Sequence, residues 1–152
     1  MKNDIIKKIR QFNRCYTVWL NVMNKSYLGT DFSWPESRVL FEIYLCQGIT
    51  ATKICEALNM DKSYVSRILG KFERQGLITR EVVPGSKGTK KLRLTNTGRK
   101  EAEIIDLNGD RQISDKLKAM DDTTLEKLCD AMTFIEKTLG GNDLHRLNRP
   151  EE

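Results

Sequence analysis

The sequence predicts a mainly α-helical fold that contains one small β-hairpin. Apolar residues recur every three or four positions over most of the chain, and regular alternation of apolar and polar residues is confined to residues 77–95. A chain of 152 residues is long enough to bury a core without disulfides or metal. We therefore expect a single domain over residues 1–140, followed by a loosely ordered tail over residues 141–152.

Long apolar stripes at both ends of the chain predict helices that pack on another helix. We expect one helix over residues 4–28 and two over residues 99–140, where Asn108-Gly109 is a candidate kink. The first stripe contains Ile5, Ile9, Phe12, Tyr16, Trp19 and Met23, and the last contains Leu125, Leu128, Met132, Ile135 and Leu139. We interpret these helices as a dimerisation layer, because the central segment does not need them for its core. Packing within a helical monomer is the alternative.

Capping signals divide the central segment into short helices. Ser33 and Glu36 form a capping box, Thr50 can cap a helix that reaches about Leu58, and Asp61 can cap another. Gly76 suits the left-handed residue that follows a helix end. Two short helices that are joined by a tight connector are typical of a helix-turn-helix.

A β-hairpin is predicted directly after the second of these helices. Leu77–Val83 and Lys91–Thr95 alternate as strands do, and the basic loop Pro84–Lys90 contains turn-forming glycines. The order predicts a winged helix-turn-helix over about residues 33–98, in which the wing extends a DNA contact to a minor groove or to phosphates. A solvated hairpin tip is the alternative.

Positive charge is concentrated in the same segment. The net charge is +5, but residues 62–100 hold eleven basic and two acidic residues and so carry +9. Within residues 61–76, one helix face is apolar, and the opposite face contains Ser63, Ser66, Arg67, Gly70 and Arg74. A narrow cationic face of this kind predicts contact with the major groove of double-stranded DNA. A merely solvated basic face is the alternative.

Several classes of protein are disfavoured. No stretch is apolar over the roughly 18 residues of a membrane span, and the N-terminus is too charged for a secretory signal, so we expect a cytoplasmic protein. His145 is the only histidine, and Cys15, Cys46, Cys55 and Cys129 lack metal-ligand spacing. We therefore expect no metal, no cofactor and no enzyme activity. The cysteines are expected to be small buried hydrophobes.

The chain resembles the MarR-type winged-helix transcription regulators over about residues 5–140. The resemblance is carried by Asn59–Leu69, by Phe72–Arg80 and by Leu94-Thr-Asn-Thr-Gly98. It implies a homodimeric DNA-binding repressor or activator, of which we expect a repressor. A two-fold dimer would place two recognition helices about one DNA turn apart, so we expect sequence-specific binding to an inverted-repeat operator. It also implies that a small ligand binds between the dimer layer and the winged helix.

A narrower likeness is to the regulators that are fused to a GNAT acetyltransferase. It is carried by Phe12–Thr17, Glu36–Glu42 and Asp61–Arg67. The chain ends before such a domain would begin, so we expect no acetyltransferase activity.

The MarR resemblance also implies which residues contact DNA. Ser63, Tyr64, Ser66 and Arg67 match the positions that meet bases and phosphates, and the rigid fork of Arg67 suits a bidentate guanine contact. The remaining expected contacts are basic: Lys62, Lys71, Arg74, Arg80, Lys87 and Lys90. The family usually carries an Asp-Arg pair in the wing, where this chain has Ser86 and Lys87.

Two forms of regulation, and one other function, remain open in the sequence. Six aromatic residues are candidates for an effector pocket that would take a small aromatic ligand, although ordinary core packing explains them equally: Tyr16, Trp19, Tyr27, Trp34, Phe41 and Tyr44. Cys15 lies on the first helix, where some peroxide-sensing relatives carry a reactive cysteine, so redox sensing is an alternative. A winged-helix module that binds protein is a third interpretation, which the basic segment disfavours.

Overall fold

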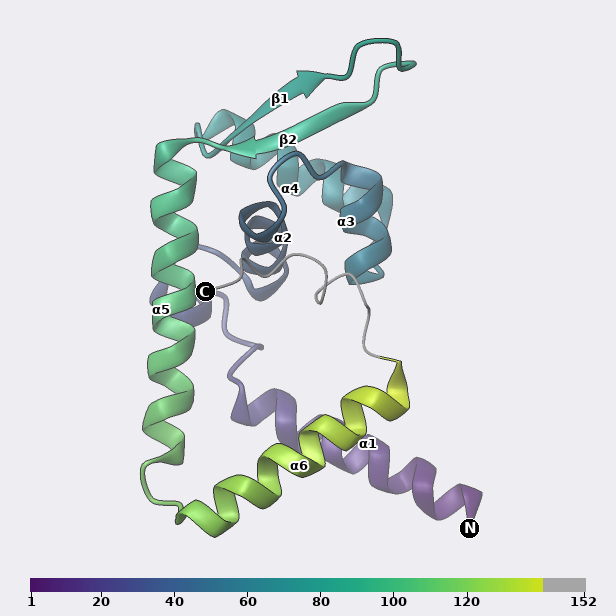
Figure 1. The fold of residues 1–152 in the computed structure, drawn as a ribbon, viewed down its shortest axis with the longest axis vertical. Helices are drawn as coiled ribbons and strands as arrows, with labels where there is room; N and C mark the ends of the chain where they lie inside the picture. Colours follow the sequence, from purple (N-terminus) through teal and green to yellow (C-terminus); the bar gives the residue numbers. More distant parts are fainter. Residues whose placement is uncertain (141–152) are drawn as a thin grey trace.

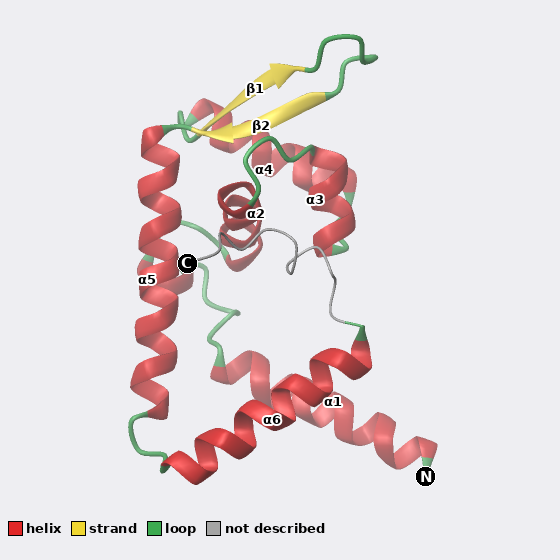
Figure 2. Cartoon of the chain, in the orientation of Figure 1, coloured by secondary structure: helices red, strands yellow, loops and turns green. Residues whose placement is uncertain are grey.

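The computed structural model describes residues 1–140, and the predicted tail 141–152 with His145 lies outside the described residues. A winged-helix body occupies one end of the molecule, and a long helix, α5, leads from it to a layer that contains α1 and α6 (Figure 1). The elements are α1 Lys2–Trp19, the 3-10 turn η1 Tyr27–Gly29, α2 Trp34–Leu45, α3 Ala51–Leu58, α4 Lys62–Arg74, β1 Ile78–Val82, β2 Lys90–Leu94, α5 Asn96–Leu117 and α6 Asp122–Leu139. The mainly helical fold with one hairpin is confirmed (Figure 2).

The core lies within the winged-helix body, between α2, α3, α4, the hairpin and the first turns of α5. The apolar face of α4 points into it, as predicted, with Val65, Leu69 and Phe72 fully buried. The rings of Phe32 and Phe72 meet edge to face with 5.8 Å between their centroids. This core holds α4 by one side and leaves its other side to solvent.

The predicted helix starts are confirmed by side-chain hydrogen bonds. Ser33 Oγ accepts from the Glu36 amide at 3.5 Å, and Glu36 Oε2 accepts from the Ser33 amide at 2.9 Å. Thr50 Oγ1 accepts from the Lys53 amide at 3.3 Å. Each bond satisfies an amide that has no partner inside the helix, so each helix begins where its cap stands.

The first helix is shorter than predicted, because α1 ends at Trp19 and not near residue 28. Asn21 adopts a left-handed conformation with φ 55°. The Asn21 amide donates to the Val18 carbonyl at 3.0 Å, and the Val22 amide donates to the Thr17 carbonyl at 3.3 Å. This Schellman arrangement stops the helix, and asparagine is one of the few residues that tolerate it.

The hairpin and α5 largely follow the predictions. β1 and β2 are antiparallel, with Ile78 opposite Leu94 and Arg80 opposite Leu92. Leu92 is buried, whereas Lys91 and Arg93 face solvent. The helix α5 runs unbroken through the candidate kink at Asn108, whose amide Nδ2 donates to the Leu28 carbonyl at 3.0 Å.

The outer helices leave most residues of their apolar stripes exposed. No residue of Lys2–Trp19 or Asp122–Leu139 is buried. The end of α1 is nevertheless attached to α5, since Gln112 Nε2 donates to the Leu20 carbonyl at 3.3 Å and the Lys116 ammonium lies 5.1 Å from the centre of the Trp19 ring. In the described part of the chain, no helix is long and apolar enough to cross a membrane.

The expectation that the cysteines are buried is wrong for two of them. Cys15 on α1 and Cys129 on α6 are exposed, and Cys46 and Cys55 are half-buried. The reason is the position of α1 and α6, which do not bury a face against the winged-helix body.

Candidate nucleic-acid interface

The helix α4 presents a polar face that is free of the core. Ser63, Ser66, Arg67 and Arg74 are exposed along it. At Gly70, an added Cβ would meet only the tip of the Arg74 side chain, at 3.3 Å. Gly76, with φ 68°, ends this run, and the Leu77 amide that follows it donates to the Phe72 carbonyl at 2.9 Å. The face is therefore cationic, shallow and bounded at its C-terminal end.

Asp61 fixes the start of α4 and remains ionised there. The hydroxyl of Ser63 donates to its carboxylate, as do the amides of Tyr64 at 3.1 Å and Ser63 at 2.9 Å. The Ser63 hydroxyl, followed by the Tyr64 amide, lowers the pKa of Asp61 below its usual value. Because Ser63 donates its proton to Asp61, its oxygen is left as an acceptor toward a ligand.

The Arg67 side chain stacks on an aromatic ring of the same helix. Its guanidinium carbon lies 5.3 Å from the centre of the Tyr64 ring, one turn earlier on α4. The stacked arginine is held along the exposed face, which reduces the side-chain entropy that it would lose on contact with a base edge.

The structure divides the predicted basic contacts into two groups. Lys71 Nζ lies 2.8 Å from Glu36 Oε1, and Arg80 Nε lies 3.1 Å from Glu73 Oε2. Both cations hold α4 in place, Lys71 against the start of α2 and Arg80 from the adjoining strand. The other predicted cations form no ion pair within residues 1–140 and are exposed: Lys62, Arg67, Arg74, Lys87 and Lys90.

The Glu36 carboxylate accepts hydrogen bonds from both the Ser33 amide and Lys71. Burial by itself raises the pKa of its carboxyl group, but the hydrogen bonds from Lys71 and from the Ser33 amide, with the charge of Lys71, outweigh it and hold the pKa below its usual value. The same side chain therefore caps α2 and anchors α4.

The tip of the wing is closed by Ser86. Its hydroxyl donates to the Val83 carbonyl at 2.7 Å and accepts from the Thr89 amide at 3.1 Å. The neighbouring Gly85 and Gly88 have φ of 76° and 86°, in the region that favours glycine. Ser86, which stands where the resemblance leads one to expect an aspartate, thus shapes the loop, and Lys87 beside it is exposed.

The six aromatic candidates for an effector pocket lie on three elements. Tyr16 stacks on Trp19 along α1 with 5.8 Å between ring centroids, and Phe41 and Tyr44 are neighbours on α2 at 5.7 Å. Tyr27 lies in η1, where burial above all raises the pKa of its phenol. Trp34, at the start of α2, lines a groove toward α4.

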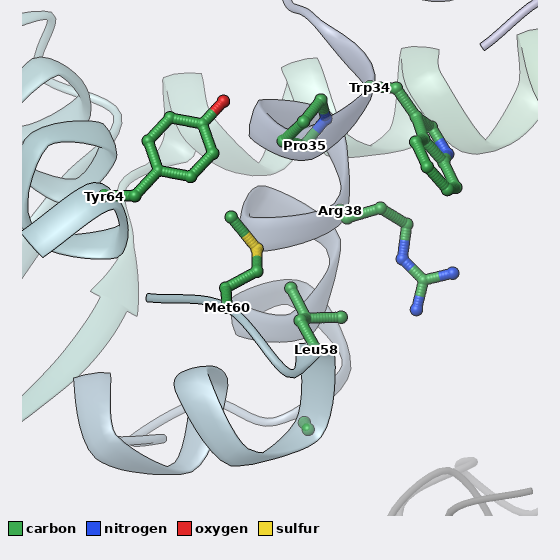
Figure 3. Close-up of a pocket in the computed structure, with 7 residues that line it drawn as sticks. Trp34, Pro35, Arg38, Leu58, Met60 and Tyr64 are labelled. Atoms are coloured by element: carbon green, nitrogen blue, oxygen red, sulfur yellow. The ribbon is translucent and has the colours of Figure 1, made fainter. Parts of the chain in front are cut away.

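That groove includes residues that the sequence analysis missed. It has a volume of about 380 Å³ and lies between α2 and the connection from α3 to α4 (Figure 3). Arg38 and Pro35 join Trp34 from α2, while Leu58, Met60 and Tyr64 line it from the other side. Trp34 and Arg38 are four residues apart, which places them on one face of a helix. This spacing does not indicate which other element that face contacts.

The redox candidate and possible metal sites were also located in the structure. Cys15, the redox candidate, is exposed on α1. Within residues 1–140, no group of three or more His, Cys, Asp and Glu side chains could hold a metal ion.

The segment that forms this interface is similar to a known protein family. Residues 30–87 match the MarR family, and this span contains α2, α3, α4, β1 and most of the wing loop. The helix α4, with its polar face, lies within the matched segment.

Similarity to other known proteins extends over most of the chain. The uncharacterized HTH-type transcriptional regulator YybA of Bacillus subtilis (strain 168) is 23% identical over 137 residues, which are 90% of this chain and 89% of the relative. A solved MarR family transcription regulator has a TM-score of 0.74 at 21% identity and covers 96% of each chain.

Two further solved relatives were determined with bound partners. Streptococcus pneumoniae FabT in complex with DNA has a TM-score of 0.69 at 17% identity, covering 92% of this chain and 98% of its own. Streptomyces coelicolor PcaV in complex with its natural ligand has a TM-score of 0.61 at 17% identity, covering 85% and 89%. At these identities, the likeness shows a common fold.

Proposed function

We propose that this protein is a transcription regulator that binds double-stranded DNA sequence-specifically through α4. The observation that carries the proposal is the polar face of α4, where Ser63, Ser66 and Arg67 are exposed to solvent while the opposite face is buried in the core. An α-helix fits the major groove of B-form DNA, and this face offers the donors and acceptors that read base edges there. FabT, which shares the fold, was solved in complex with DNA, and this supports DNA as the partner.

The contacts divide by chemistry. Arg67 is proposed to donate two hydrogen bonds to a guanine, with Ser63, Tyr64 and Ser66 beside it. The exposed cations Lys62 and Arg74 neutralise phosphates. Lys87 and Lys90 bring the wing to a minor groove or to phosphates. For Lys71 and Arg80, which form ion pairs with Glu36 and Glu73, we propose a role in positioning α4.

We propose a homodimer in which α1 and α6 of two copies cover each other. Ile5, Ile9 and Phe12 on α1 and Met132 and Ile135 on α6 are all exposed within the single chain. Exposed apolar stripes on two long helices are typical of a subunit interface. A two-fold dimer places two copies of α4 about 34 Å apart and so reads an inverted repeat.

The proposed sign of control is repression, relieved by a small aromatic effector. A protein that covers a promoter excludes other proteins from it, and a ligand that binds the DNA-free state more tightly lowers the affinity for DNA. The ligand complex of PcaV supports a ligand for this fold. Oxidation of the exposed Cys15 is a second means of release, which peroxide treatment with Cys15→Ser as control would test.

A binding selection from random duplex DNA tests the function. We expect an inverted repeat whose half-sites are about one helical turn apart. Repeating the selection with Arg67→Ala should relax the preference at one position of each half-site and weaken binding by about 1–3 kcal/mol. Lys71→Met is the matched control, since a positioning residue should leave the base preference unchanged. Enrichment of no sequence by the wild type would contradict the proposal.

A further inference from the structure

We propose that Gln47 is a positioning residue for the wing, the hairpin formed by β1, β2 and the loop between them. Its side chain ties β2 to the end of α2 and so fixes where Lys87 and Lys90 lie relative to α4. The part of the proposal that concerns DNA rests on the proposed function, whereas the attachment of the wing does not. Three observations carry the inference: the exposed outer half of the hairpin, a β-bulge at Gly48 and the two hydrogen bonds of the Gln47 side chain.

The outer half of the wing lies outside the core. Near the base of the hairpin, Ile78 and Leu92 are buried, whereas Val82 at the end of β1 is 62% exposed. The loop between the two strands projects away from the helices (Figure 1). An isolated two-stranded hairpin is only marginally stable in water. The direction of the outer half therefore depends on how the base of the hairpin is attached to the winged-helix body.

A β-bulge joins the base of β2 to the connection between α2 and α3. The Gly48 amide donates to the Leu92 carbonyl at 2.8 Å, and the Leu92 amide donates to the Ile49 carbonyl at 2.9 Å. Two residues of the connection thus lie opposite one residue of β2. Gly48 has a φ of 92°, in the region that favours glycine and that this type of bulge requires. A bulge interrupts the regular ladder of backbone hydrogen bonds, and beyond this one a side chain provides the next hydrogen bond to β2.

That side chain is Gln47, which bonds a strand and a helix at the same time. Its Oε1 accepts from the Leu94 amide at 3.0 Å, and its Nε2 donates to the Ile43 carbonyl at 2.8 Å. The Ile43 carbonyl lies near the end of α2, where backbone carbonyls lack partners inside the helix. Such a bridge requires a group that both donates and accepts, as a side-chain amide does. Gln47 itself is exposed, so its part is to attach the wing and not to fill the core.

The end of α2 is a fixed reference for the wing, because Leu40 and Ile43 of this helix are fully buried in the core. Lys90 and Leu94 are the first and last residues of β2. At the usual rise of a strand they are roughly 13 Å apart, so a rotation of about 15° at Leu94 would move Lys90 by about 3 Å. A shift of this size breaks a hydrogen bond to a phosphate. Without Gln47, the wing would sample more directions, and DNA would have to order it at a cost in conformational entropy.

NMR relaxation of the DNA-free protein tests the attachment. Gln47→Met keeps a long, unbranched side chain but removes the amide that forms both hydrogen bonds. We expect it to lower the backbone order parameters along β1 and β2 by about 0.1 or more from the value near 0.85 of rigid backbone, and to leave those of α4 unchanged. Gln11→Met, which replaces an exposed glutamine on α1, is the matched control and should change neither set. Order parameters along the hairpin that are equal in Gln47→Met and the wild type would overturn the attachment.

A double-mutant cycle with Lys87 tests the positioning. Fluorescence anisotropy on the selected DNA would compare Gln47→Met, Lys87→Ala and the variant that carries both substitutions. We expect each single substitution to weaken binding about threefold or more, and Lys87→Ala to weaken it by less than about twofold once Gln47 is replaced. The base preference found by selection should stay unchanged, because α4 keeps its place. Effects that simply multiply overturn the positioning role, since a residue that only stabilises the fold would act independently of Lys87.

The two measurements separate failure of this inference from failure of the proposed function. A wild-type protein that binds no DNA contradicts the proposed function, while the relaxation data still decide whether Gln47 holds the wing. Lower order parameters in Gln47→Met together with unchanged DNA affinity would show that Gln47 holds the wing without serving DNA binding. That result overturns the positioning of Lys87 and Lys90.

Discussion

At Gly98 the chain has no room for a side chain. An added Cβ would lie 2.0 Å from the carbonyl oxygen of Leu77, at the point where the start of α5 crosses the beginning of the hairpin. Thr95 reinforces the crossing, because its hydroxyl bonds to the Gly76 carbonyl at 2.6 Å and accepts from the Gly98 amide at 3.1 Å. The Leu-Thr-x-x-Gly run that carries the family resemblance is therefore a close contact between two backbones.

We predict that Gly98→Ala lowers the free energy of unfolding by about 1–3 kcal/mol, because the backbone of Leu77 has to move. Urea denaturation would measure the change. Gly109→Ala is the matched control on the same helix, since its Cβ would meet only the end of the Leu28 side chain at 3.7 Å. The control should be neutral or stabilising by up to about 1 kcal/mol. Equal effects of the two substitutions would contradict the close contact.

The ion pair between Glu36 and Lys71 gives a prediction with a pH dependence. Glu36→Gln keeps the reciprocal cap but removes the charge, and it should destabilise the fold at pH 7 by about 1–3 kcal/mol. The pKa of Glu36 is lowered in the folded state, so the stabilisation is present above the unfolded pKa and is lost as the pH falls through the folded pKa.

Urea denaturation of both proteins between pH 7 and pH 3 would therefore show curves that converge at acid pH. Glu56→Gln is the control, because its pair with Lys53 is exposed and should contribute less than about 1 kcal/mol. A difference between wild type and Glu36→Gln that stays constant with pH would exclude the ion pair as its cause.

At the scale of elements, the outer helices differ from the winged-helix body because, within residues 1–140, none of their residues is buried. Ile135→Asp on the stripe of α6 should weaken the proposed dimerisation at least about tenfold, because a charge would replace apolar surface in the proposed interface. Sedimentation equilibrium would measure the dissociation constant. Thr133→Asp places the same charge on another side of α6 and serves as the control. If both variants remained dimers, α6 would not lie in the interface.

At the scale of the whole molecule, we expect the exposed cations of two protomers in the proposed dimer to act together on DNA. If Lys62, Arg74, Lys87 and Lys90 of both copies neutralise phosphates, a plot of log affinity against log salt concentration should have a slope of about −7. Lys87→Ala removes one cation per protomer and should reduce the slope by about 2 while it weakens all sequences evenly. Anisotropy titrations between low and moderate salt would measure it. A slope that Lys87→Ala does not change would place the wing away from the phosphates.

Much of the fold, and part of the site, was predictable from the sequence because the deciding interactions are local. Ser33, Thr50 and Asp61 each bond to amides two or three residues ahead, so their spacing alone marks a helix start. No local pattern marks the end of the first helix at Asn21, because its left-handed conformation depends on the packing of Val22, which follows it and is buried. The first helix was therefore predicted too long.

The sequence by itself determined the order of the helices, the hairpin and the cationic face of α4, because helical periodicity and capping depend on residues three or four apart. Only the tertiary structure decided which cations are free. Lys71 is separated from Glu36 by 35 residues, and no local pattern indicates that they meet. The groove likewise exists only where α2 packs beside the α3–α4 connection, which brings Arg38 and Tyr64 to one place. Burial and ion pairing across such distances depend on how whole elements pack together. A single stretch of sequence does not contain that information.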